Sequence, residues 1–401
     1  MTTPPPLTGI RVLAVEQYGA GPFCSMYLSD LGAEVIKIED PATGDSSRHT
    51  GPHFLGRGES LFYQTFNLGK KSLALDLRSA EGKEVFHRLV RTADVVLNNL
   101  RGDQPAKLGL TYGVLGSLNP RIVCGHLSGY GRVGARAAWP AYDYLAQAEA
   151  GFLSVTGEPD TPPSRMGLPV VDFLTGLTLA VGLNAALVGA LKTGKGRDVD
   201  VTLYDVAMHQ LTYPGSWYLN EDDEIGRRPR SGHPSIVPCE AFPTKDGRMF
   251  LMCILPKFWE ELCAIIGRPD LPADPAYATP EARWENRESL IAIIDGKLSH
   301  RTSAEWMALF AGKVPAAPIL TLGQALDNPY FAATGGIQSF DHPLRAGLRA
   351  VSNPIRLDGE RRPARPAPLL GADTDAVLAS AGYSAEEIAG LRGRGVAGAK
   401  R

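Results

Sequence analysis

The chain has 401 residues, more than a single hydrophobic core usually organises, so we expect about two domains. Hydrophobic residues make up 44% and charged residues 21% of the chain, as in soluble globular proteins. The formal net charge of −2 gives no sign of a surface for nucleic acid or for an acidic membrane, so we expect neither as a partner.

The five cysteines are dispersed and form no Cys-x-x-Cys pair, so neither a disulfide framework nor a thiolate metal site is indicated. Buried free thiols in a reducing cytoplasm are the simplest interpretation. The eight histidines show no metal-ligand spacing, and we expect no metal. The first residues, Met1–Pro6, lack a basic stretch followed by an apolar one. We therefore predict a cytoplasmic protein.

Apolar runs alternate with amphipathic stretches over the first 130 residues, which indicates a parallel sheet with right-handed crossovers. The runs predict strands at residues 10–15, 34–38, 72–77, 94–97 and 121–127. The intervening stretches predict helices at residues 23–31, 80–92 and 112–118. Folds of this class bind ligands outside the carboxyl ends of their strands.

A long uncharged run, Phe173–Leu191, predicts a helix that ends at the basic and glycine-containing segment Lys192–Gly196. Its length would also suit a bilayer, but the run contains several small and polar residues, and the chain shows no second such run. We therefore expect a helix buried in a large core.

The second half of the chain changes character. Residues 199–203 alternate like a strand, and residues 221–236 have the composition of a loop. The Asp246-Gly247 pair predicts a hairpin between residues 239–243 and 249–254. Amphipathic helices are then expected at residues 256–267, 282–298 and 303–312, and a last helix near residues 385–394 closes a proline-rich tail.

Asp172 lies at the start of the uncharged helix and has two interpretations. As a helix N-cap it would accept hydrogen bonds from free backbone N–H groups. As a nucleophile it would attack an acyl group and form a covalent intermediate. Position alone favours the cap, because Asp is among the preferred N-cap residues.

Two other patterns give weak signals. Gly19-x-Gly21 follows the first strand, but Cys24 replaces the third glycine of a dinucleotide fingerprint, and Pro22 lacks a backbone donor for phosphate. The basic residues Lys70, Lys71 and Arg78 could contact a phosphate or form a solvated face, and the sequence leaves both open.

Several segments together resemble the family III CoA-transferases, in the family's order and over nearly the whole chain. They are Leu7–Leu13 with Gly19–Pro22, Leu31–Glu39, Asn67–Ser72 with Leu75–Leu77, Ala93–Val96 with Asn99, Lys107–Leu110, Leu127–Gly131, Tyr142-Asp143, and Pro368–Gly371 with Thr374-Asp375.

The resemblance implies an α/β fold: a large Rossmann-like domain with a parallel sheet, a smaller α+β domain, and an interlocked homodimer. We expect the large domain over residues 1–205, a linker over 206–224 and the small domain over 225–325. Residues 326–401 would form a second linker and a segment that returns to the large domain.

The resemblance also implies that Asp172 is the nucleophile of an enzyme that moves coenzyme A between carboxylic acids. Acyl-CoA and a carboxylate would be substrates, with no tightly bound cofactor and no metal. By matching positions, coenzyme A would contact Gln17, Tyr18, Ala20, Leu75, Asn99, Leu100 and Lys107, with Lys107 as a phosphate partner.

The sequence departs from formyl-CoA transferase, a family member that uses oxalate. That enzyme's glycine-rich loop has no counterpart here, where Ser231–Ser235 stands in its place, and Ser128 replaces a lysine near its active site. The α-methylacyl-CoA racemases of the same family need a histidine and a glutamate for proton transfer, and Tyr142 and Leu255 stand at those positions. We therefore expect a transferase rather than a racemase.

The expected reaction passes through an aspartyl anhydride and an aspartyl-CoA thioester at Asp172. The helix start would keep this carboxylate ionised and therefore nucleophilic. Asp143 could supply a supporting hydrogen bond or be structural. Succinyl-CoA or another dicarboxylyl-CoA is the expected donor. Its second carboxylate could pair with one of Arg48, His49, Arg132 and Arg136, or these four could be exposed loop residues, and the sequence leaves both open. A racemase and a CoA-ester-binding protein without activity remain the alternatives.

Overall fold

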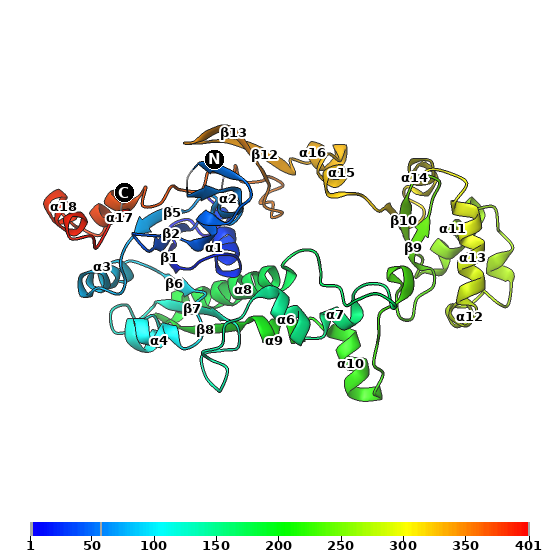
Figure 1. The fold of residues 1–401 in the computed structure, drawn as a ribbon, viewed down its shortest axis with the longest axis horizontal. Coiled ribbons are helices and arrows are strands. Elements are labelled where there is room, and N and C mark those ends of the chain that lie inside the picture. Colours follow the sequence, from blue (N-terminus) through cyan, green and yellow to red (C-terminus); the bar gives the residue numbers. More distant parts are fainter. Residues whose placement is uncertain (1–2, 57, 400–401) are drawn as a thin grey trace. The chain divides into compact units, whose positions relative to one another are not determined.

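The computed structural model describes residues 3–56 and 58–399. These residues form two compact units, which Figure 1 shows as a ribbon coloured along the chain. The first unit comprises residues 1–150, 167–210 and 330–401, and the second comprises residues 151–166 and 211–329.

A six-stranded parallel sheet forms the centre of the first unit, in the order β5 (Lys71–Ala74), β2 (Glu34–Glu39), β1 (Arg11–Val15), β6 (Val95–Asn98), β7 (Val123–Ser128), β8 (Arg197–Thr202). Counted along the chain, this is the doubly wound order 3-2-1-4-5-6. The expected Rossmann-like parallel sheet is confirmed, and the alternating segment near residue 200 is its sixth strand.

Helices cover both faces of this sheet. On one face, α3 (Ala80–Val90), α17 (Thr374–Ser380) and α18 (Ala385–Gly393) share a core with alternate residues of the strands. Figure 1 shows α17 and α18 beside β5 and α3. On the other face, α8 (Val170–Thr193) packs on α1 (Ala20–Asp30), β7 and β8. C-terminal residues thus complete the core of the N-terminal sheet.

The helix α8 is long and apolar enough to span a membrane by length and composition, which is weak evidence because core helices of soluble proteins pass the same test. Its inner face, which includes Leu179, Leu183 and Leu187, is buried, whereas Val181 and Leu191 are exposed. The helix ends at Gly194 in the left-handed conformation (φ 72°), as the sequence predicts.

The second unit contains an antiparallel sheet in the order β11 (Ala316–Pro318), β10 (Arg248–Met252), β9 (Cys239–Pro243). The predicted hairpin is therefore present as β9 and β10. The helices α11 (Pro256–Ile265), α12 (Pro280–Glu285), α13 (Arg287–Leu298) and α14 (Ser303–Phe310) belong to this unit. Their core includes Trp259, Leu262 and Phe310.

Two boundaries of the compact units differ from the expected domains. Residues 151–166 group with the second unit, and the expected linker at 206–224 contains the end of α9 (Leu203–His209) and all of α10 (Thr212–Glu221). Pro214 is tolerated because it lies in the first turn of α10, where its missing N–H has no helical partner to lose.

The remaining elements are short: η1 (Ser46–His49), β3 (Phe54–Gly56), β4 (Glu59–Ser60), α2 (Leu61–Asn67), α4 (Gln104–Leu108), α5 (Tyr112–Leu115), α6 (Asp143–Glu149), α7 (Phe152–Val155), η2 (Pro229–Ser231), η3 (Leu271–Ala273), α15 (Leu322–Leu326), α16 (Pro329–Ala333), β12 (Ile337–His342) and β13 (Arg345–Val351). All five cysteines are buried and free, as expected from their spacing.

Candidate functional site

The strand order places a switch point between β1 and β6, from which the chain winds in opposite directions along the sheet. The loops that follow these two strands are joined by one side chain. Asn99 Oδ1 accepts a hydrogen bond from the Gln17 N–H at 2.9 Å, and Asn99 Nδ2 donates to the Gln17 carbonyl at 2.7 Å. Two predicted CoA-contacting residues, 82 positions apart, therefore meet at this edge.

Glycines allow α1 and α8 to approach closely at the same edge. A Cβ on Gly176 would lie 2.7 Å from the carbonyl oxygen of Ala20, closer than real contacts permit. A Cβ on Gly19 would likewise lie 2.9 Å from Oδ2 of Asp172. The start of α8 thus brings the Asp172 carboxylate against Gly19, the residue that precedes α1.

Asp172 is not the N-cap of α8, which corrects one interpretation of the sequence. The helix begins at Val170, so Asp172 is its third residue, and the N-cap position belongs to Pro169, which makes no side-chain cap. The Asp172 N–H instead donates to Oδ2 of Asp143 at 2.9 Å. Of the two roles left open for Asp143, the structure shows a hydrogen bond to the backbone of Asp172, which is also structural because the buried carboxylate satisfies one of the free N–H groups of α8.

The protonation of Asp172 also differs from the expectation of a stably ionised carboxylate. Burial and the neighbouring charge of Asp143 raise the pKa of Asp172 to about 7. Both effects disfavour a negative charge on Asp172. The carboxyl group of Asp172 therefore gains or loses its proton near neutral pH.

A cavity of about 400 Å³ opens over this carboxylate. Its wall is formed by the loops after β1, β6 and β7, the segment before α6, and the first residues of α8 and α9. The lining residues are Gln17, Tyr18, Gly19, Ala20, Asn99, Leu100, Arg101, Gln104, Leu127, Ser128, Gly129, Trp139, Pro140, Ala141, Tyr142, Asp172 and Leu203. One cavity therefore holds the predicted nucleophile and five of the seven predicted CoA-contacting residues.

Comparison with known proteins identifies the family of the chain. The family model described as CoA-transferase family III matches residues 7–374. The chain is 36% identical over 392 residues to the succinate–glutarate CoA-transferase of Agrobacterium fabrum, covering 94% of this chain and 95% of that protein. It is 30% identical over 411 residues to the formyl-CoA:oxalate CoA-transferase of Escherichia coli O157:H7, covering 96% and 98%.

The chain belongs to CoA-transferase family III. The prediction of a CoA-transferase of this family is thereby confirmed. A crystal structure of a CAIB/BAIF family protein from Brucella suis has the same fold, with a TM-score of 0.82 and 32% identity over 94% of this chain and 100% of that chain.

Two residues that the family resemblance associates with coenzyme A do not line the cavity. Leu75 is 2% exposed and packs in the core shared with α17 and α18. Lys107 pairs with Asp103 at 2.6 Å on α4. Their contact with coenzyme A stays a prediction. Arg101 supplies a basic side chain to the cavity. No sequence motif marks this residue, so it could not be predicted.

The four residues considered for a second substrate carboxylate have other partners. Arg48 is buried and bonds Glu39 at 2.8 Å and Glu59 at 2.6 Å. Arg132 pairs with Asp200, and Arg136 with Glu149. The ring of His49 lies 3.1 Å from the Thr43 carbonyl. None of the four lines the cavity, so a contact between any of them and a second substrate carboxylate stays a prediction.

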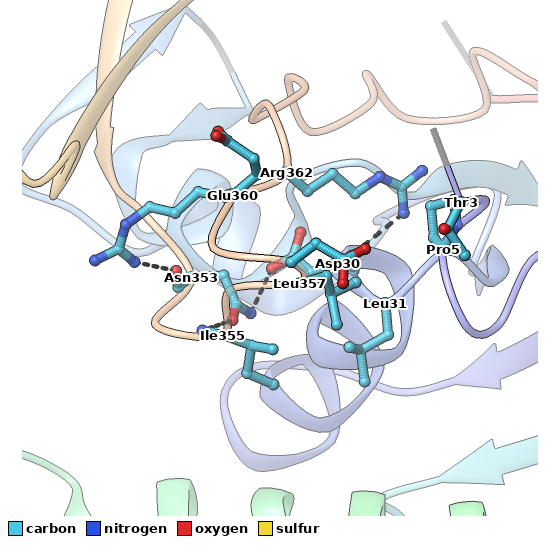
Figure 2. A pocket seen from close by; sticks show the side chains of 11 residues that line it. Thr3, Pro5, Asp30, Leu31, Asn353, Ile355, Leu357, Glu360 and Arg362 are labelled. Carbon is cyan, nitrogen blue, oxygen red and sulfur yellow. Dashed lines mark hydrogen bonds between the residues drawn. The ribbon is translucent and has the colours of Figure 1, made fainter. Parts of the chain in front are cut away.

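A second cavity, of about 420 Å³, lies at the opposite end of α1 (Figure 2). Several of its polar side chains bond to each other or to the backbone. Asn353 Nδ2 donates to Asp30 Oδ2 at 2.7 Å, and Arg362 donates to the Ser29 carbonyl at 2.5 Å at the end of α1. This arrangement anchors the C-terminal segment to α1, which gives the second cavity a structural role. We therefore place the candidate active site at the first cavity, beside Asp172.

Proposed function

We propose that this enzyme transfers coenzyme A from an acyl-CoA to a carboxylic acid, with Asp172 as the nucleophile. The observation that carries the proposal is the position of the Asp172 carboxylate, which lines a cavity at the switch point of the sheet beside the start of α1. A carboxylate in a partly enclosed site can attack a thioester, because thiolate is a good leaving group.

In the first half of the reaction, an Asp172 oxygen attacks the acyl-CoA carbonyl and the C–S bond breaks. The products are a mixed anhydride and the CoA thiolate. The thiolate then attacks the aspartyl carbonyl, which releases the donor acid as a carboxylate and leaves an aspartyl-CoA thioester. Enclosure of the cavity would limit hydrolysis of both intermediates.

In the second half, the acceptor carboxylate attacks the aspartyl carbonyl of the thioester and expels the CoA thiolate. The thiolate attacks the acceptor's own acyl carbon in the new anhydride. The product acyl-CoA forms and Asp172 returns as a carboxylate. The N–H groups at the start of α1 lie at the same edge and would stabilise the oxyanions of these steps.

We propose succinyl-CoA or another dicarboxylyl-CoA as the donor, in a cytoplasmic homodimer. The relative from Agrobacterium fabrum, named for succinate and glutarate, supports this substrate class. A panel of acyl-CoA donors against mono- and dicarboxylate acceptors, read by mass spectrometry, tests the proposal. Failure of every donor–acceptor pair to exchange coenzyme A would contradict it.

One observation favours a second candidate, an α-methylacyl-CoA racemase or isomerase. A carboxyl group with a pKa of about 7 suits proton transfer as well as nucleophilic attack. Entry of solvent deuterium at the α-carbon of an acyl-CoA, without exchange of coenzyme A between acids, would establish this activity in place of transfer.

The pH dependence of transfer follows from the pKa of Asp172. Only the ionised carboxylate is nucleophilic, so kcat/KM is expected to rise as the pH increases through about 7 and to level off above it. Replacing Asp143 by asparagine keeps a hydrogen-bond acceptor but removes the negative charge. The rising limb should therefore move to lower pH in the Asp143→Asn variant, which pH–rate profiles of the two proteins would show.

A further inference from the structure

The loop Glu16–Gly19 ends at Gly19, which lies against Asp172. Side chains from distant segments hold the backbone of this loop. Asn99 bonds both the N–H and the carbonyl of Gln17. Lys37 Nζ donates to the Glu16 carbonyl at 3.0 Å. The Tyr18 N–H donates to Oδ1 of Asp45 at 3.0 Å. Backbone groups of the loop are thus fixed from outside rather than by regular structure.

Tyr18 adopts a left-handed backbone conformation, with φ at 69°. This conformation is unfavourable for a bulky residue with a Cβ and persists where the surroundings impose it. It turns the chain just before Gly19, where a side chain would collide with the Asp172 carboxylate. The position of Gly19 therefore depends on what holds Tyr18.

Asp45 is itself held in place by several contacts and in turn holds the backbone N–H of Tyr18. Its Oδ2 pairs with Lys37 Nζ at 2.8 Å, and both side chains are fully buried. Its Oδ1 accepts from the N–H groups of Tyr18 and Ser47, and its own N–H donates to Glu39. These contacts keep the carboxylate in one place, and its pKa lies below the ordinary value because Lys37 and the N–H donors outweigh the effect of burial.

We infer that Asp45 is a positioning residue for the reaction at Asp172: it imposes the left-handed conformation of Tyr18 and so keeps Gly19 against the nucleophile. The inference rests on the proposed function. Asp45 does not line the cavity itself, so the buried ion pair would act on the cavity through the backbone of Tyr18 and Gly19. A purely structural Asp45 would lower stability and leave the geometry at Gly19 unchanged.

Asp45→Asn tests the inference, because it removes the charge that pairs with Lys37 and leaves one carbonyl oxygen where two carboxylate oxygens contact Tyr18 and Lys37. We expect kcat/KM to fall at least about ten-fold, mostly through kcat. Asp94→Asn is the matched control: Oδ2 of Asp94 accepts from the Arg11 N–H at 2.9 Å at the other end of β1. This control is expected to keep kcat and KM within about two-fold of the unaltered enzyme.

A second replacement separates positioning from stability. Asparagine tolerates the left-handed region better than tyrosine, so Tyr18→Asn should make the loop less dependent on Asp45. Asp45→Asn should then lower kcat by no more than about three-fold in the Tyr18→Asn background. An equal loss of kcat in both backgrounds would overturn the inference.

Hydrogen exchange gives a readout that does not require activity. The peptide containing Tyr18 should exchange faster in Asp45→Asn than in the unaltered protein, while the same peptide in Asp94→Asn should not change. Unchanged exchange in Asp45→Asn would overturn the inference. Exchange as expected, in an enzyme that transfers no coenzyme A, would contradict the proposed function alone.

Should Asp45→Asn fail to fold, Lys37→Met with Asp45→Asn removes both charges of the buried pair together and carries the same tests. Because Lys37 also holds the Glu16 carbonyl, Lys37→Met alone is the reference for this double variant. Relative to that reference, the kcat and the exchange of the double variant are expected to change as stated for Asp45→Asn. A folded double variant whose kcat and exchange at Tyr18 equal those of Lys37→Met would overturn the inference.

Discussion

Replacing Asp172 by alanine is expected to lower the rate of CoA transfer by at least about 10⁴-fold, because the group that would carry the acyl and CoA intermediates is then missing. The protein should remain folded, since the Asp172 side chain makes no cap for α8. Initial rates with the best donor–acceptor pair, together with circular dichroism and the Tm, measure both expectations.

Asp205→Ala is the matched control for this variant. Asp205 is also the third residue of a helix of the first unit, α9, but it is exposed and does not line the cavity. Its replacement should leave transfer within about two-fold of the unaltered rate. A CoA adduct on the peptide containing Asp172, detected by mass spectrometry after incubation with acyl-CoA, is the positive test. An Asp172→Ala enzyme with appreciable transfer would refute the nucleophile assignment.

Replacing Gly176 by alanine is expected to destabilise the protein by about 2 kcal/mol and to reduce transfer as well. The added Cβ would meet backbone atoms of α1, the Ala20 carbonyl oxygen at 2.7 Å and the Cys24 nitrogen at 3.2 Å. Backbone cannot move aside as a flexible side chain can, so α1 and α8 must separate. Gly19 and Asp172 would separate with them.

Gly189→Ala, in the same helix, provides the contrast. A Cβ at Gly189 would meet no atom within 4 Å. Alanine is the better helix former, so this variant should gain about 0.5–1 kcal/mol of stability and keep full activity. Urea unfolding and initial rates distinguish the two glycines. Equal effects of the two replacements would show that close approach of α1 and α8 is unimportant.

Much of the secondary structure could be predicted from local sequence patterns. The buried strands of the sheet, the end of α8 at Gly194 and the β9–β10 hairpin follow from apolar periodicity and turn chemistry, which act over a few residues. The helix α10 lies in the stretch expected to be a linker, and it tolerates Pro214 because a proline in a first turn costs little.

The candidate site could be predicted only in part. Motif matches identified Asp172 and most of the residues around it, but they also included Leu75, which is buried in the core. Arg101 has no motif, and the carboxylate partners of Arg48 and Arg132 belong to other elements of the fold, such as Glu39 on β2 and Asp200 on β8. Whether a charged side chain is free for a substrate depends on such partners, which no local pattern reveals.

The sequence by itself determined the family and the alternation of strands and helices, and it singled out Asp172 as the residue that we propose to carry a CoA group. The tertiary structure alone decided what surrounds that residue. Strand order brings Gln17 to Asn99, and glycine contacts bring Gly19 to Asp172. Asp143 and burial raise the pKa of Asp172 to about 7. These properties depend on distances between groups remote in the chain, and such distances exist only once the chain has folded.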